Sequence, residues 1–169
     1  EACQITKHPT FIRCGSCGSL QSDIRLGDLV ITKASVRMDN VTRPFVHDGY
    51  PAVADSDVTL ALAMASRKTE VPFHVGITAS VPSFYGAQER DIEGFPLYRS
   101  GDLEKFTQMN VANFEMESGT LLVLASLRRI RAGAICAVYA ERLKDIFAEE
   151  EIRSASEAKC IDASLEAFR

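Results

Sequence analysis

Strand-like and helix-like segments alternate along this chain, and this alternation restricts the fold more than any other feature of the sequence. The strand candidates are short and rich in β-branched or apolar residues, whereas the helix candidates carry strong helix formers and an apolar stripe. Such alternation is typical of an α/β domain with a largely parallel or mixed sheet. We expect strands at 10–13, 29–34, 74–79, 112–117 and 132–140, and helices at 59–66, 103–109, 118–129 and 148–169.

Two of the expected helices carry a recognisable start signal. Ser56 or Asp57 precedes the helix at 59–66 and is placed to cap its free amide groups. Asp102 stands in the same relation to the helix at 103–109. These signals predict where the two helices begin.

The composition excludes several classes of protein. A content of 46% apolar and 25% charged residues over 169 positions is ordinary for a globular chain, so we expect one domain over residues 1–169. The longest apolar run, 132–140, predicts a strand buried on both faces, but it is far shorter than the roughly 18 residues of a membrane span. With 19 basic and 23 acidic residues, the chain offers no basic face for nucleic acid. The odd number of cysteines, five, and the lack of a leader-like start predict a reducing, cytoplasmic location.

The motif Cys14-Gly-Ser-Cys17 permits more than one interpretation. A CxxC pair can be a redox centre or half of a zinc site, but no second pair follows it, and we favour two reduced structural thiols. Arg13 precedes the motif at the end of the expected strand. We therefore expect a glycine-containing loop at 14–18 that either presents an anion site with Arg13 and Ser16 or is a plain tight turn.

A second group of polar residues follows the strand at 74–79. Gln88 carries both a donor and an acceptor, which suits the imide edge of a pyrimidine, and Arg90 can bind a further carbonyl. Phe84 precedes them and can stack on a flat ring. The alternative is a solvated polar loop.

Two further pairs of charged residues stand at strand ends. Glu115 and Glu117 lie where an extended segment meets a buried helix, so Glu117 can accept hydrogen bonds from a vicinal diol such as ribose or simply favour the helix start. Glu141 and Arg142 follow the apolar run, where open α/β sheets bind ligands or where the chain simply reaches water.

These segments together resemble the nucleoside phosphorylase family, and its uridine-specific branch most of all. The matching segments occur in the order of the family and span nearly the whole chain. They are FIRCGSCG (11–18), GDLVIT (27–32), ASVR (34–37), PAVAD (51–55), HVGITAS (74–80), FYGAQER (84–90), NFEMES (113–118) and the stretch 130–142.

The resemblance implies a fold, a reaction and a set of site residues. The fold is a central mixed β-sheet flanked by helices, and the reaction is phosphorolysis of uridine to uracil and ribose 1-phosphate. Inorganic phosphate is the co-substrate, with no cofactor and no metal. The implied assembly is a homo-oligomer, dimer or hexamer, with sites near subunit interfaces and no nucleic-acid or membrane partner. By position, the resemblance implies that Arg13 and Ser16 bind phosphate and that Ser16, Met116 and Glu117 bind ribose. It implies that uracil is bound by Phe84, Gln88, Arg90, Phe114 and Arg142, and that the catalytic residues are Arg13, Glu117 and Arg142.

The chain also departs from the family pattern. The N-terminal strands of the family, with a first phosphate loop and its arginines, have no counterpart in this sequence. Glu141 replaces an asparagine typical of the uridine branch, and an acid near this position protonates the base in the purine branch. Three alternatives follow: a purine nucleoside phosphorylase, a nucleosidase that uses water, and a catalytically weakened partner subunit of an oligomer. A zinc or redox protein built on Cys14 and Cys17 comes last.

Overall fold

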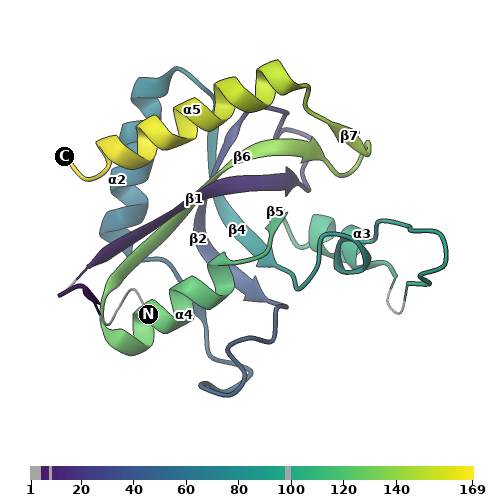
Figure 1. The fold of residues 1–169 in the computed structure, drawn as a ribbon, viewed down its shortest axis with the longest axis horizontal. Helices are drawn as coiled ribbons and strands as arrows, with labels where there is room; N and C mark the ends of the chain where they lie inside the picture. Colours follow the sequence, from purple (N-terminus) through teal and green to yellow (C-terminus); the bar gives the residue numbers. More distant parts are fainter. Residues whose placement is uncertain (1–4, 8, 98–99) are drawn as a thin grey trace.

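Five strands close into a small barrel at the centre of the molecule. The structure is a computed structural model that describes residues 5–7, 9–97 and 100–169. Its sheet is mixed, with the order β3-β2-β4-β5-β1-β6-β7, and β2 also pairs with β6. This extra pairing joins β2, β4, β5, β1 and β6 into a closed ring, around which the helices pack (Figure 1). The expected α/β fold, a central mixed sheet flanked by helices, is confirmed.

The elements follow the expected alternation. The strands are β1 (Thr10–Ser19), β2 (Leu29–Arg37), β3 (Ala52–Val53), β4 (Phe73–Ser80), β5 (Val111–Glu115), β6 (Arg131–Glu141) and β7 (Ile146–Phe147). The α-helices are α2 (Ser56–Ser66), α3 (Asp102–Gln108), α4 (Ser118–Arg128) and α5 (Glu150–Glu166), with short 3₁₀ turns η1 (Arg67–Thr69) and η2 (Gly86–Gln88).

The apolar run at 132–140 forms a buried strand of the barrel wall. It lies in β6, which is parallel to β1 and antiparallel to β2, and nearly all of its residues are buried. A strand covered on both faces has no need of polar alternation, which is why its sequence is almost continuously apolar. The expectation for this strand is confirmed.

The first strand differs from the expectation. We expected it to end at Arg13 and to be followed by a loop, but β1 continues to Ser19 and pairs with β6 from Thr10 to Ser19. The expected glycine-containing loop at 14–18 is therefore wrong. The main reason is non-local, because ladder bonds to β6 hold the glycines extended. The side chain of Arg13, in the same strand, and that of Arg142 fill the space that the missing Cβ atoms leave.

The helix starts also differ from the expected caps. Asp55 caps α2, since its carboxylate accepts from the backbone N–H groups of Asp57 and Val58 at 3.0 and 3.1 Å. A capping residue needs non-helical backbone, which Asp55 has and Asp57, in the first turn, does not. Likewise Gly101 stands at the cap of α3, and Asp102 is its first helical residue.

The helices cover two sides of the barrel. α2 and α5 contact each other and pack on β2 and β6, around a cluster that includes Leu62, Ile135 and Cys160. α4 packs on β2, β3 and β6 on the opposite side (Figure 1). This arrangement leaves the carboxyl ends of β1, β4, β5 and β6 near one another. In the described part of the chain, no helix is long and apolar enough to cross a membrane.

Candidate active site

One cavity gathers eight of the nine site residues that the sequence analysis singled out. It has a volume of about 320 Å³ and is formed by β1, the segment after β4, the β5–α4 junction and the end of β6. The residues from the expected set that line it are Arg13, Ser16, Phe84, Gln88, Arg90, Phe114, Met116 and Glu117. Residues far apart in the sequence thus meet at one end of the barrel, as ligand sites in α/β sheets do.

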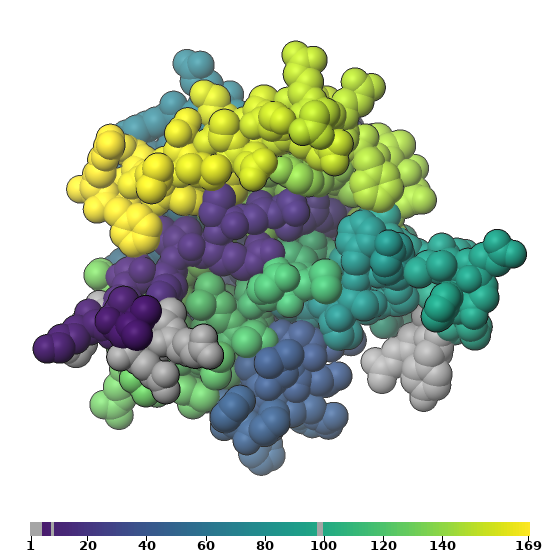
Figure 2. Space-filling model, in the orientation of Figure 1, coloured from purple at the N-terminus to yellow at the C-terminus, as the bar shows by residue number. Residues whose placement is uncertain are grey.

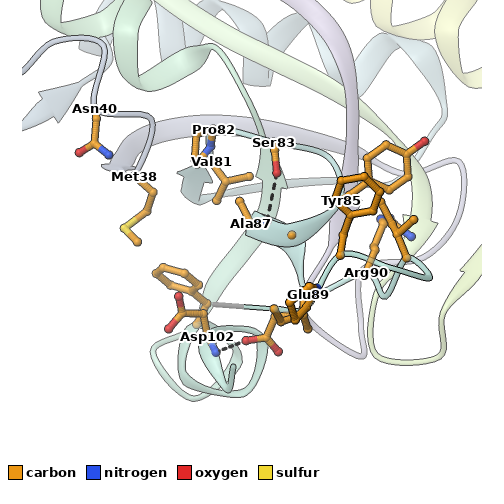
Figure 3. Close-up of a pocket in the computed structure, with 16 residues that line it drawn as sticks. Met38, Asn40, Val81, Pro82, Ser83, Tyr85, Ala87, Glu89, Arg90 and Asp102 are labelled. Carbon is orange, nitrogen blue, oxygen red and sulfur yellow. Dashed lines mark hydrogen bonds between the residues drawn. The ribbon is translucent and has the colours of Figure 1, made fainter. Parts of the chain in front are cut away.

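A larger cavity, of about 550 Å³, lies beside the first. Its lining is mostly apolar, and Arg90 is the one member of the expected set among its described residues. Figure 3 shows residues that line this larger cavity, among them Ala87, Glu89 and Arg90. The backbone N–H of Ala87 donates to the Ser83 hydroxyl at 3.1 Å, and the Glu89 carboxylate accepts from the backbone N–H of Asp102. We take the smaller cavity as the candidate active site because the polar groups converge there.

Arg13 and Glu117 form an ion pair in the candidate site. The Arg13 guanidinium donates to Glu117 Oε2 through both Nε, at 3.1 Å, and NH2. Burial by itself lowers the pKa of Arg13, but Cys136, Glu115 and Glu117 together raise it above its usual value. The Glu117 side chain is 60% exposed, so the pair is open to a ligand. In the space-filling view, atoms of β1 lie at the surface between α5 and the green segments (Figure 2).

Glu115 is a site residue to which the sequence analysis gave no separate role. Its side chain is fully buried, and its carboxylate accepts from the backbone N–H groups of Glu117 and Ser118 at 2.9 and 2.8 Å. It also lies 3.4 Å from Arg13 Nε. Glu115 therefore fixes the start of α4 and orients both members of the exposed ion pair. An acid just before a helix start was the available signal.

The base-facing part of the cavity centres on Arg90. Its guanidinium carbon lies 4.4 Å from the ring centroid of Phe84 and 4.7 Å from that of Phe147. Burial, reinforced by the nearby charge of Arg142, lowers the pKa of Arg90. Gln88 is buried beside it, and its amide side chain faces the same cavity. Phe147, on β7, was not foreseen because a two-residue strand has no distinctive sequence pattern.

Two aromatic and apolar residues complete the floor of the cavity. Phe114 is only 1% exposed, and its ring packs edge to face on Phe106 at 5.6 Å, so it belongs to the core as well as to the lining. Met116 follows at the β5–α4 junction and is partly buried. Both side chains offer an apolar surface next to the polar groups.

Arg142 is the one residue of the expected set that does not line the cavity. Its side chain is almost fully buried and passes over Gly18. A Cβ added at Gly18 would lie 3.0 Å from Arg142 Cγ and Cδ. Its NH2 donates to the backbone carbonyl of Gln88 at 2.8 Å. Arg142 thus lies behind Gln88 rather than against the cavity.

Glu141 points away from the cavity. Its carboxylate accepts from the Leu26 backbone N–H at 3.3 Å and from Lys144, and Arg25 lies 3.6 Å away. The hydrogen bond from Lys144 lowers the pKa of Glu141, which keeps the carboxyl ionised. An ionised, turned-away acid is not placed to protonate a base in the cavity.

The two cysteines of the CxxC motif lie in β1 and make different contacts. Cys14 is exposed, and its Sγ is 3.2 Å from that of Cys160 on α5. Cys17 is buried in a cluster with Cys136 and Val138. The motif therefore cannot act as a paired redox or zinc centre in this structure.

Comparison with known proteins identifies relatives of this chain. The family model described as "Phosphorylase superfamily" matches residues 2–167. The chain is 46% identical to a uridine phosphorylase of Thermococcus kodakarensis over 82% of its own length and 50% of the relative's. It is 37% identical to a uridine phosphorylase of Escherichia coli, with coverage of 95% and 64%. A purine nucleoside phosphorylase of Plasmodium falciparum is also 37% identical, with coverage of 82% and 53%. The chain thus spans about half to two thirds of the length of these relatives.

Proposed function

This chain belongs to the phosphorylase superfamily, and we propose that the protein catalyses the phosphorolysis of uridine to uracil and ribose 1-phosphate. One observation carries the proposal: a single cavity combines the ion pair Arg13–Glu117 with the amide of Gln88 and the guanidinium of Arg90. The first pair suits phosphate and a sugar diol, and the second suits a pyrimidine edge. The names of the relatives from Thermococcus kodakarensis and Escherichia coli support the same substrate.

We propose that Arg13 and Ser16 bind phosphate and that Glu117 binds the ribose hydroxyls. The planar fork of arginine matches phosphate, and Ser16, an exposed residue, lines the same cavity. A phosphate that takes one side of Arg13 frees Glu117 from the ion pair. The released carboxylate can then accept hydrogen bonds from the ribose diol, with Met116 packed beneath the sugar.

We propose that Gln88 and Arg90 bind the uracil edge, with Phe84 and Phe114 beside the ring. Arg142 contributes by holding the Gln88 carbonyl at 2.8 Å. The orientation of Glu141 supports a pyrimidine rather than a purine. A purine leaving group is assisted by protonation, and Glu141 is bound instead by Lys144 and the Leu26 backbone.

In the proposed reaction, a phosphate oxygen forms a bond to the anomeric carbon while the bond from that carbon to uracil N1 breaks. The bonding electron pair leaves with uracil, where the negative charge spreads over the ring carbonyls. Arg90 stabilises that charge, and Glu117 lies by the sugar, which becomes positive in the transition state. Groups fixed in place before the reaction lower the barrier by positioning and by electrostatic stabilisation, with no covalent intermediate.

We further propose that the protein works as a homo-oligomer with its sites near subunit interfaces. The open side of the cavity supports this proposal, since Glu117 and Ser16 are exposed at the phosphate end. A neighbouring subunit would exclude water from that end, which strengthens the charge interactions inside.

The test is uracil release from uridine by the purified protein in its natural full length, with and without phosphate. The proposal expects release only with phosphate, together with ribose 1-phosphate in equal amount. Release without phosphate would indicate a nucleosidase, and turnover of inosine or guanosine but not uridine would indicate a purine enzyme. No release with any nucleoside would favour the weakened partner subunit.

A further inference from the structure

A single carboxylate oxygen in the turn between β6 and β7 contacts two arginines of the site. Asp145 Oδ1 accepts from Arg142 NH1 at 2.5 Å and lies 3.4 Å from Arg90 NH1, which also donates to it. Asp145 adopts left-handed backbone with φ of 50°, a conformation that aspartate tolerates better than most residues. This turn geometry directs its carboxylate back toward the barrel end.

The two arginines depend on this oxygen for their charge balance. Their side chains are only 3% and 10% exposed, and each guanidinium carries a buried Nε that has no hydrogen-bond partner among the described residues. The Arg142 charge lowers the pKa of Arg90, whereas Asp145 raises it. Without Asp145, two buried guanidinium groups would repel each other with no carboxylate between them.

The same turn also holds Arg90 from the side. Phe147, two residues after Asp145, places its ring 4.7 Å from the Arg90 guanidinium carbon, and Phe84 lies 4.4 Å from it. Arg142 in turn fixes the Gln88 carbonyl. One short turn is therefore linked to the side chain of Arg90 and to the backbone of Gln88, the two residues that the proposed function assigns to the uracil edge.

Resting on the proposed function, we propose that Asp145 is a positioning residue, which aims Arg90 directly and Gln88 through Arg142 at the pyrimidine edge. Asp145 itself is 73% exposed and need not touch the substrate. The position of Arg90 matters most in the transition state, when negative charge develops on the leaving uracil. Loss of Asp145 should therefore lower kcat more than it raises KM for uridine.

The test uses the full-length protein with Asp145→Asn, Asp145→Glu and a matched control, Asp48→Asn. Asp48 is equally exposed, at 74%, and pairs with Arg43 at 3.2 Å outside the cavity. We expect Asp145→Asn to lower kcat for uridine about tenfold, a size in line with a misplaced catalytic group. KM for phosphate should not change, and the unfolding temperature should fall only slightly, because Asp145 itself is 73% exposed. Asp145→Glu should recover most of the activity, and Asp48→Asn should match the wild type.

Two results would overturn the assignment. Wild-type kinetics in Asp145→Asn would show that the carboxylate does not position Arg90. A lower unfolding temperature, with uridine and phosphate use reduced alike and no recovery in Asp145→Glu, would show a structural role instead.

Uracil binding, measured by calorimetry on the same proteins, separates this inference from the proposed function. If the wild type binds uracil but does not release it from uridine, the phosphorolysis proposal fails. The role of Asp145 then stands if Asp145→Asn weakens uracil binding at least severalfold, and fails if it does not. A wild type that neither binds uracil nor uses uridine overturns both.

Discussion

Gly15→Ala should lower activity strongly without unfolding the protein. The Arg13 guanidinium folds back over Gly15 on the same face of β1, and a Cβ at that position would lie 2.6 Å from Arg13 NH1 and 2.9 Å from Cζ and NH2. Ordinary contact begins at 3.4 Å, so the guanidinium must retreat by about 0.8 Å. That retreat lengthens the 3.1 Å bond to Glu117 and moves the group that we assign to phosphate.

The displacement is large enough to measure. A shift of about 1 Å in a positioned group can cost about 100-fold in rate, so we expect kcat/KM for phosphate to fall between about 10- and 100-fold. Each factor of ten corresponds to about 1.4 kcal/mol of lost transition-state stabilisation. Folding should change little, because alanine is roughly 0.5–1 kcal/mol better than glycine within a strand and offsets a weakened, half-exposed ion pair.

The assay measures uracil release at saturating uridine over a range of phosphate concentrations, together with thermal unfolding.

Two glycines serve as controls. At Gly133 an added Cβ would lie 2.5 Å from Val58 Cγ1 in the core, so Gly133→Ala should lower the unfolding temperature, with about 1–3 kcal/mol of overpacking, and leave the phosphate dependence alone. At Gly49 nothing lies within 4 Å, so Gly49→Ala should change neither. Normal phosphate kinetics in Gly15→Ala would refute the role given to Arg13.

Two other changes should have distinct results. Glu117→Gln keeps one acceptor oxygen but loses the charge, so uridine turnover should fall at least tenfold while the unfolding temperature holds, since the side chain is 60% exposed; near-normal turnover would contradict the ribose assignment. The hydrogen bond with Cys160 lowers the pKa of Cys14 to about 6, so its thiolate should dominate at pH 7 and iodoacetamide should label Cys14 before the buried Cys17 and Cys136. Mass spectrometry across pH 5 to 8 measures this, and labelling that begins only above pH 8 would contradict it.

The sequence predicts well those elements whose cause is local. The apolar run in β6, the helix formers of α2 and the buried helix α4 each carry their pattern within a dozen residues. A strand that is buried on both faces, or a helix that is buried along one stripe, shows this burial directly in its pattern of apolar residues. The fold class also follows, because alternating strands and helices favour an α/β sheet.

The errors arise where the cause is distant in the chain. Residues 14–18 are rich in small residues and look like a loop, yet Arg13 covers Gly15 and Arg142 covers Gly18 inside a strand. The sequence could not reveal this, because pairing with β6 holds these residues extended and the arginine that covers Gly18 follows β6, far along the chain. Glycine in this strand marks the close approach of an arginine rather than a bend.

The candidate site shows the same division. Residue types identified the groups that line the cavity, but not which of them point into it. Arg142 and Glu141 are adjacent in sequence, yet Arg142 holds Gln88 and Glu141 binds Leu26 and Lys144. Their directions depend on β1 and on the turn after β6, and neither influence is visible in a two-residue motif.

The charges of the cavity explain why these directions matter for the proposed reaction. Carboxylates gather where the sugar would become positive, with Glu117 at the opening and Glu115 buried behind it. Guanidinium groups gather where uracil would become negative, with Arg90 in the cavity and Arg142 behind it. Glu115 orients Glu117 through its backbone N–H, and Asp145 links Arg90 to Arg142. Each developing charge thus faces a fixed charge of opposite sign, which stabilises the charge separation of the transition state, and little reorganisation is needed when the bond to uracil breaks.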